Sequence, residues 1–352
     1  MRAARASQAA RARKVLVELD GVPALAPLLS SPVTNVVVSA SGALFNAALS
    51  VAGANRIRAE PGLVAALLGA GGLAHADARV RGNAAGVLQN VAAHSDAGRE
   101  QLADAGALGA LLTLIAAEAV GAAGSGGDVA VLARAVGALS NLALLEGNAR
   151  ALCAPKAVTP APAQPSAPTA LGALSLLLEV VQSSTREDTL EDASHALVRI
   201  LTVEPAARSE LVTLDGLPAV QGLIAALDDE LQLRGCELLQ MCALSDARTH
   251  TFALAAALVG LLVERLGSAS EEVQEAAVRA ITALFVRPAF GRAFRKADGI
   301  GGLVALLAAS KDVPLLAACL CAARRGARQA KRDGAPLVRE CAARAAGRGA
   351  AD

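Results

Sequence analysis

The chain has 352 residues, of which 54% are hydrophobic and 18% charged, with a net charge of +1 and a mean hydropathy of +0.46. This composition excludes a disordered chain, and the length exceeds what one compact core usually organises, so we expect several domains or an elongated array. Aromatic residues make up 1%, without Trp or Tyr. A chain with so few stacking platforms and so little net charge is not expected to bind nucleic acid.

The N-terminal residues 1–14 carry five basic residues and no acid. A basic segment without acids has the composition of an organelle transit peptide, although Arg11 and Arg13 also fit the first helix of a folded unit. We therefore expect a basic segment at 1–8 and folded structure from residue 9.

The apolar run from Thr251 to Val263 ends at Glu264 and is too short to cross a bilayer, so no membrane span is expected.

A short turn followed by an apolar helix recurs along the chain about every 40 to 47 residues, a period typical of helical repeat arrays. Each copy has a marker at the turn, namely Gly21, Gly62, Gly106, Gly172, Gly216, Ala257 and Gly299. Each turn is preceded by a short helical segment with an arginine, namely Arg13, Arg56, Arg99, Arg150, Arg208, Arg248, Arg292 and Arg328. Each unit is therefore predicted to contain a short helix, a turn, an apolar helix and a longer amphipathic third helix.

Acidic residues recur at the predicted starts of the later third helices, at 187–192, 228–230 and 271–272. Carboxylates in a first helical turn complement the helix dipole, so we interpret them as structural and not catalytic. Two insertions interrupt the array: a Gly-rich loop at 118–128 and a Pro-rich loop at 154–168. Neither has the pattern of a phosphate-binding loop.

The segments NAAGVLQNVAAHSDAGREQLADAGALGALLTLI at 83–115 and AVGALSNLALLEGNARAL at 135–152 resemble the armadillo repeat family. The resemblance implies an all-α fold, a right-handed α-α superhelix of about seven to eight units over residues 9–345, with a tail at 346–352. It also implies a non-catalytic scaffold that binds a protein or an extended peptide along a concave groove. We expect such a scaffold to be cytoplasmic, with nuclear or organellar targeting left open.

An asparagine interrupts the third helix of the first three units, at Asn46, Asn90 and Asn141. Helical geometry places Val80, Ala84, Val87, Leu88 and Val91 on the buried face, with Asn83 and Asn90 on a flanking stripe. In the armadillo family the matching asparagine holds the backbone of a bound peptide, which the resemblance implies for these three residues; Asn83 and Arg134, seven positions earlier, are expected beside them. The alternative is that each amide ties its own helix to a neighbour.

The position four residues before each asparagine is Gly42, Gly86 or Gly137, whereas importin-type members have Trp there. The resemblance therefore favours a general scaffold over a transport receptor, and the small glycines are expected to let a peptide backbone come close. In the later units Arg199 replaces the asparagine, while Arg234 and Arg279 occupy neighbouring groove positions. We expect these arginines to make that part basic and to favour an acidic partner segment.

The six cysteines and four histidines show no metal-ligand or catalytic spacing, so no cofactor, metal or enzymatic activity is expected. Reduced, buried thiols are the interpretation we adopt. An enzyme would require a cluster of reactive groups in a pocket, and a structural spacer would require a groove blocked by side chains or by residues 154–168.

Overall fold

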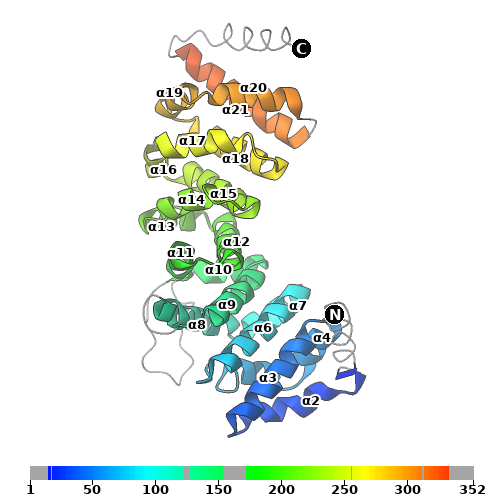
Figure 1. Cartoon of the computed structure of the whole chain (residues 1–352). Coiled ribbons are helices and arrows are strands. Elements are labelled where there is room, and N and C mark those ends of the chain that lie inside the picture. The colour runs from blue at the N-terminus through cyan, green and yellow to red at the C-terminus, as the bar shows by residue number, and fades with distance from the viewer. Residues whose placement is uncertain are drawn as a thin grey trace. The chain divides into compact units, whose positions relative to one another are not determined.

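The computed structural model describes residues 15–16, 18–122, 127–153, 172–254, 256–310 and 313–332. Every regular element in these ranges is a helix (Figure 1). The expectations for 1–8, 154–168 and 346–352 lie outside the described residues. The chain divides after Val203 into two compact units, each described by itself.

Unit 1 repeats the predicted order of a short first helix, an apolar second helix and a long third helix. The third helices α3, α6, α9 and α12 pack side by side in that order, and α9 and α12 also pack on α8 and α11, the second helices of their own repeats. The elements are α2 (Gly21–Leu25), the 3-10 helix η1 (Ala26–Ser30), α3 (Thr34–Ala48), α4 (Val51–Ala59), α5 (Leu63–Leu68), α6 (Ala78–His94), α7 (Asp96–Asp104), α8 (Ala107–Ala122), α9 (Val129–Leu142), α10 (Glu146–Cys153), α11 (Ala173–Ser183) and α12 (Glu187–Val203).

Unit 2 has the same order, and its third helices α15, α18 and α21 pack side by side. Three of its phenylalanines, Phe285, Phe290 and Phe294, form a buried aromatic cluster between α18 and α19. The elements are α13 (Pro205–Thr213), α14 (Leu217–Ile224), α15 (Asp229–Ser245), α16 (Ala247–Phe252), α17 (Ala256–Arg265), α18 (Glu271–Leu284), α19 (Pro288–Lys296), α20 (Gly299–Ala309) and α21 (Val313–Arg332).

The turn before the second helix has a left-handed residue in several repeats. In unit 2 this residue is Asp215 with φ 57° or Asp298 with φ 59°, and in unit 1 it is Asp20 with φ 54°, Gly62 with φ 74° or Gly106 with φ 89°. Where aspartate takes this conformation, the next residue is a glycine in close contact with the preceding helix: a Cβ on Gly216 would lie 2.8 Å from the carbonyl oxygen of Leu211. In the Asp-Gly pair the aspartate therefore adopts the positive φ, and the glycine allows the close approach to the preceding helix.

The third helices bury the face that the periodicity predicts. On α6 the residues Val80, Ala84, Val87, Leu88 and Val91 are all buried. Most of the acidic residues predicted at helix starts lie in first turns, as Glu187 and Asp188 do on α12 and Glu271 and Glu272 on α18; Glu191 and Asp192 lie beyond the first turn of α12. These parts of the prediction are confirmed, because they depend only on local periodicity and on the helix dipole.

Two local expectations were wrong. Arg328 does not open a separate short helix but lies inside the long helix α21. The flexible loop expected at 118–128 starts later, because α8 continues to Ala122. Glu118 is 4% exposed and accepts hydrogen bonds from Arg81 Nε at 2.8 Å and from the backbone nitrogen of Asp128 at 2.7 Å. The Ala-rich sequence propagates the helix, and this anchored carboxylate holds its last turns in place.

Candidate peptide-binding surface

The side chains predicted to bind a peptide lie mostly on the row of third helices in each unit. In unit 1 they come from α3, α6, α9 and α12, which lie next to one another in Figure 1. We call the exposed and half-buried residues of these four helices the third-helix surface of unit 1.

Asn46, Asn90 and Asn141 occupy matching positions in three repeats. In Asn46 and Asn90 the amide nitrogen is not used by the fold. Asn46 is exposed at the end of α3 and makes no side-chain hydrogen bond to any residue that the structure describes. Asn90 is half-buried on α6, and its Nδ2 group is a buried donor without an acceptor in the described part of the chain. A buried donor without a partner costs about 1–3 kcal/mol, so a bound acceptor would be favoured there.

Asn83 and Asn141 instead tie neighbouring third helices together. Asn83 Nδ2 donates to Ser41 Oγ at 3.1 Å, which joins α6 to α3. Asn141 Nδ2 donates to the carbonyl oxygen of Gln89 at 3.1 Å, which joins α9 to α6. Unit 2 has an equivalent bond that the sequence reasoning did not include, from Arg325 on α21 to the carbonyl oxygen of Thr282 at 2.8 Å. For these residues the alternative interpretation, an internal tie, describes the observed contacts.

Two of the three glycines, Gly86 and Gly137, are covered by side chains, contrary to the expectation that they leave room for a peptide backbone. A Cβ on Gly86 would lie 2.6 Å from two ring carbons of Phe45, so the Phe45 ring fills this space. A Cβ on Gly137 would collide with the side chain of Gln89 and lie 2.7 Å from Asp192 Oδ2. Long side chains from the neighbouring helices therefore cross over the glycines and link helices that are not adjacent. The sequence shows the glycines but not which side chains cover them.

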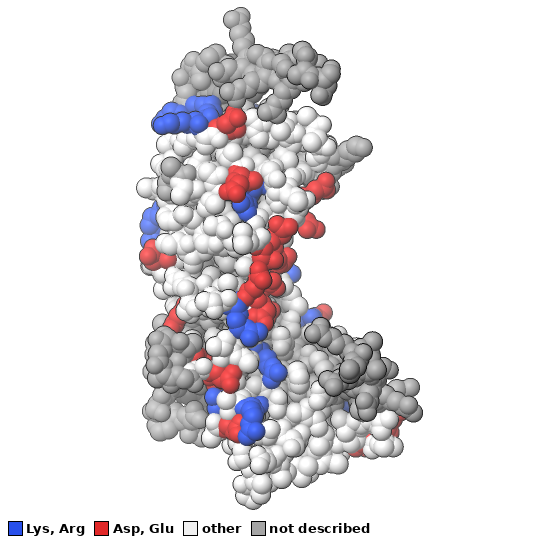
Figure 2. Space-filling model, viewed as in Figure 1, with Lys and Arg blue, Asp and Glu red and all other residues white. Residues whose placement is uncertain are grey.

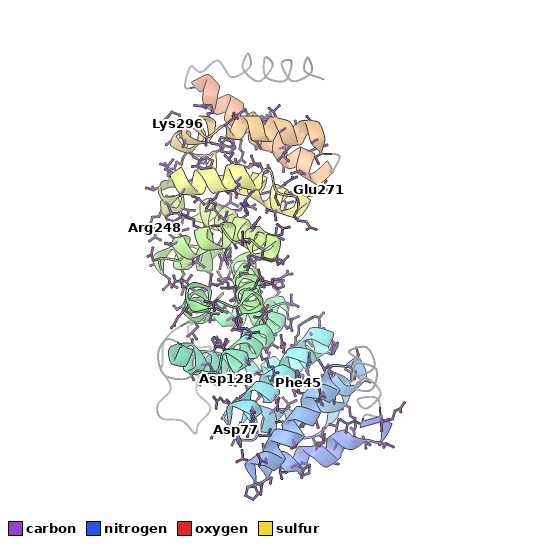
Figure 3. All side chains as sticks on the ribbon, in the orientation of Figure 1. Phe45, Asp77, Asp128, Arg248, Glu271 and Lys296 are labelled. Atoms are coloured by element: carbon purple, nitrogen blue, oxygen red, sulfur yellow. The ribbon has the colours of Figure 1, made fainter. Side chains whose placement is uncertain are left out.

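Arg134 lies on α9 and reaches toward α3 across α6. Its guanidinium carbon is 4.7 Å from the centroid of the Phe45 ring, a cation-π contact. Its Cδ is 3.4 Å from the position that a Cβ on Gly86 would occupy. Phe45, labelled in Figure 3, is the aromatic ring that sequence reasoning missed, because one phenylalanine in an apolar helix reads as a core residue.

Asp192 on α12 is a half-buried carboxylate over Gly137. Burial, together with the negative charges of Asp188 and Glu191, raises the pKa of Asp192 to about 6. A carboxylate whose pKa is raised in this way lacks a compensating cation. Arg199 lies about two turns further along α12 and is exposed. Its Nε lies 3.2 Å from His195 Nε2.

The arginines predicted to make the later part basic are neutralised by carboxylates of their own helices. Arg234 is 18% exposed and forms ion pairs with Glu230 and with Glu237, the latter at 2.8 Å. Arg279 pairs with Glu275 at 2.5 Å. The expectation of a basic surface is therefore wrong for Arg234 and Arg279. The signal was present in the sequence, since residues three and four apart on a helix are neighbours.

Carboxylates outnumber arginines on α15 and α18, which carry Asp229, Glu230, Glu237, Glu271, Glu272 and Glu275 against Arg234 and Arg279. Figure 2 shows red side chains at the amino-terminal ends of these two helices, and Figure 3 places Glu271 at the start of α18. This part of unit 2 is therefore acidic.

Cys236, Cys242 and Cys319 are buried as expected, whereas Cys321 is exposed and Cys153 is half-buried, so the expectation of buried thiols is wrong for these two. Cys236 and Cys242 are buried, and burial raises the pKa of both thiols to about 12. A raised pKa is the opposite of what an activated nucleophile requires. Among the described residues no three His, Cys, Asp or Glu side chains are grouped so as to hold a metal ion.

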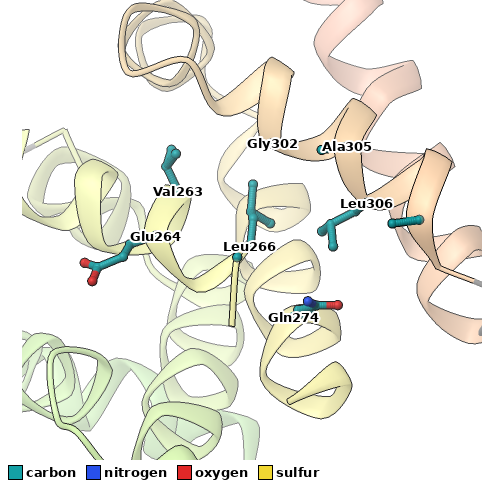
Figure 4. Close-up of a pocket in the computed structure, with 9 residues that line it drawn as sticks. Val263, Glu264, Leu266, Gln274, Gly302, Ala305 and Leu306 are labelled. Carbon is teal, nitrogen blue, oxygen red and sulfur yellow. The ribbon is translucent and has the colours of Figure 1, made fainter. Parts of the chain in front are cut away.

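A cavity of about 460 Å³ in unit 2 lies between α17, α18 and α20 (Figure 4). Its lining is mostly aliphatic, with Val263, Leu266 and Leu306 among the contributors. The polar Gln274 in its wall already donates to the carbonyl oxygen of Ser268 at 2.7 Å. The cavity therefore offers few polar groups to orient a ligand.

In the described ranges no single helix is both long and apolar enough to cross a membrane, although two sharply bent helix pairs pass by length and composition alone.

No protein-family model matches the sequence, and no curated protein matches it. Solved structures do. An engineered protein of the Northeast Structural Genomics Consortium is 25% identical, with a TM-score of 0.71, over 90% of this chain and 70% of that chain. A designed armadillo repeat protein in complex with the peptide (KR)4 is 19% identical, with a TM-score of 0.55, over 72% of this chain and 96% of that chain. Computationally designed armadillo repeat proteins for modular peptide recognition are 17% identical, with a TM-score of 0.55, over 86% of this chain and 99% of that chain.

These similarities extend over most of the chain and agree with the all-α solenoid expected from the sequence. The chain has an armadillo-like repeat fold.

Proposed function

We propose that this chain is a non-catalytic scaffold that binds an extended peptide or a segment of a partner protein on the third-helix surface of unit 1. The observation that carries the proposal is Asn90, whose buried Nδ2 donor has no acceptor among the described residues, beside the exposed amide of Asn46. An asparagine amide has both a donor and an acceptor and can therefore satisfy the backbone of an extended peptide. A designed protein of the same fold has been solved with a bound peptide, which supports this use of the fold.

The charges of unit 2 favour a partner of the opposite sign to the one expected from the sequence. Arg234 and Arg279 are engaged by carboxylates, and the remaining carboxylates of α15 and α18 are exposed or half-buried. An acidic surface attracts Lys-rich or Arg-rich segments and repels acidic ones. We therefore propose that unit 2 prefers basic segments of a partner.

The proposal contains no catalytic step. The buried thiols have raised pKa values, and the carboxylates at helix starts complement helix dipoles or pair with arginines. Among the described residues these groups therefore have structural roles.

A structural spacer without a groove ligand is the second candidate. It is favoured by the internal ties of Asn83 and Asn141 and by the side chains that cover Gly86 and Gly137. The two candidates differ in what they require of Asn46 and Asn90, because only the scaffold needs these amides for a partner.

The test is fluorescence anisotropy with a set of labelled extended peptides of different charge, using the full chain. Replacing Asn46 and Asn90 together with Ala is expected to weaken the bound peptides about tenfold, since each hydrogen bond contributes about 0.5–1.5 kcal/mol. Asn83→Ala is the matched control, because it removes an amide that is already satisfied within the fold. It is expected to lower stability and leave affinity unchanged. Full affinity in the double variant would show that the bound peptide does not use these amides, and failure of every peptide to bind the wild type would favour the spacer.

A further inference from the structure

Arg134 stands out because its guanidinium group is held in place by a ring and not by a carboxylate. Phe45 lies flat against the α6 backbone at Gly86, and the Arg134 guanidinium lies over the ring at 4.7 Å. The ring needs the space that Gly86 leaves free, and the Arg134 side chain lies in contact distance of the same position. Three neighbouring helices, α3, α6 and α9, therefore fix the position of this one cation.

Most arginines of unit 1 that the structure describes have an acidic partner. Arg79 pairs with Asp77 at 2.7 Å, Arg81 with Glu118 at 2.7 Å, and Arg150 with Glu146. Arg134 makes no ion pair and no hydrogen bond with any residue in the described ranges. Its donors are consequently unused by the fold.

Asp192 does not neutralise Arg134. The Asp192 carboxyl lies at Gly137, three residues after Arg134 on α9: a Cβ there would lie 2.7 Å from Asp192 Oδ2 and would also meet Gln89. A carboxylate paired with a guanidinium would have a lowered pKa, whereas the pKa of Asp192 is raised by burial and by two neighbouring acids. The charge of Arg134 therefore remains available on the third-helix surface.

Stacking on an aromatic ring uses the face of a guanidinium and leaves its N–H edge free. That edge matches the two oxygens of a carboxylate, with which arginine forms paired hydrogen bonds. Asn90 adds a second unused donor: it lies one turn from Gly86 on the same face of α6, and its Nδ2 has no acceptor among the described residues. Neither donor has an acidic partner among the described residues.

We propose that Arg134, stacked on Phe45 and accompanied by Asn90, forms a subsite for one carboxylate of the bound peptide. The inference rests on the proposed function and makes it specific: unit 1 selects a partner with an acidic side chain or a free carboxyl terminus at this point. Phe45 is a positioning residue in this subsite, since the guanidinium carbon of Arg134 lies over its ring.

The experiment measures anisotropy with four extended peptides that share a neutral backbone sequence. One has a free terminal carboxylate, one is amidated, one is amidated and contains a glutamate, and one is amidated and contains a lysine. We expect the glutamate peptide or the free-acid peptide to bind about tenfold more tightly than the amidated neutral peptide. The comparison of these two arms distinguishes a side-chain carboxylate from a terminal one, and either result supports the subsite.

Arg134→Gln is expected to abolish this preference and leave binding of the amidated neutral peptide unchanged. The matched control is Arg150→Gln, which removes the same charge from an exposed ion pair on α10 and should retain the preference. Circular dichroism monitors folding. If Arg134→Gln does not fold, Arg134→Lys keeps the charge and is expected to lose part of the preference, because an ammonium group cannot form the paired hydrogen bonds.

If the wild type binds the glutamate and free-acid peptides no more tightly than the amidated neutral peptide, the inference is overturned and the proposed function stays intact. A preference for the carboxylate peptides that persists in both Arg134 variants would also overturn the inference and leave the proposed function intact. Failure of every peptide to bind would overturn both.

Discussion

The ion pair between Glu118 and Arg81 provides a sharp test of how the structure holds the third helices in place. Glu118 is 4% exposed and Arg81 21% exposed, and their closest oxygen and nitrogen are 2.7 Å apart. Arg81 also donates to the carbonyl oxygens of His75 and Ala76, at 3.1 and 2.8 Å, and Glu118 accepts from the backbone nitrogen of Asp128. One buried pair thus joins the turn before α6, the end of α8 and the start of α9.

Replacing Glu118 with Gln leaves the guanidinium of Arg81 half-buried without a counter-charge. Breaking a buried pair by removal of one partner costs about 3–5 kcal/mol, and the partial exposure of Arg81 places the expected loss at the lower end, about 3 kcal/mol. The matched control is Glu146→Gln. It removes a carboxylate from the pair with Arg150, in which both side chains are more than half exposed, and should cost about 0–1 kcal/mol.

The assay is urea denaturation followed by far-ultraviolet circular dichroism, combined with amide hydrogen exchange. Because repeats contact only their neighbours, the loss of protection should concentrate in α6, α8 and α9. If Glu118→Gln shifts the urea midpoint no more than Glu146→Gln, or if protection falls equally in all helices, the buried pair does not anchor this region.

Three further outcomes follow from burial and packing. Gly86→Ala should destabilise unit 1 by about 1–3 kcal/mol in urea denaturation, because the new methyl group overlaps a ring, whereas Gly222→Ala, which meets nothing within 4 Å, should be neutral or stabilising by up to ~1 kcal/mol. An equal effect of the two changes would contradict the packing described here. Burial raises the pKa of Asp192 to about 6, so its ionised form opposes folding above that pH. Asp192→Asn should therefore raise the free energy of unfolding by up to ~3 kcal/mol near pH 8 and by little near pH 4. A stabilisation independent of pH would refute this. A thiol reagent near pH 8 should modify exposed Cys321 well before buried Cys236 when followed by mass spectrometry, and similar rates would contradict the burial.

The repeat architecture could be predicted from the sequence because its signals are local. The buried stripe on α6 from Val80 to Val91 follows from helical periodicity, and the Asp-Gly and Gly turns before the second helices follow from the demand for positive φ. The acidic first turns of α12 and α18 follow from the helix dipole. None of these features depends on which residue lies opposite in space.

The candidate site could be predicted only in part, for a related reason. Asn46, Asn90 and Asn141 share a position in the repeat, yet Asn141 is bonded to the preceding helix while Asn90 has an unused donor. Sequence position alone cannot distinguish these states, because they depend on neighbouring rotamers and on the offset between helices. The pairing of Arg234 with Glu230 and Glu237 was visible as spacing, but its consequence, an acidic and not a basic surface, required the observed contacts.

The sequence by itself determined the helical repeats, their period and their buried faces, since these depend on interactions within a few residues along the chain. The tertiary structure decided what covers the glycines. Phe45 and Arg134 are far apart in the sequence and meet only because α3, α6 and α9 pack side by side, with Gly86 between them. The distance between adjacent helices, set by close packing of the core, brings these side chains together, and no local pattern records it.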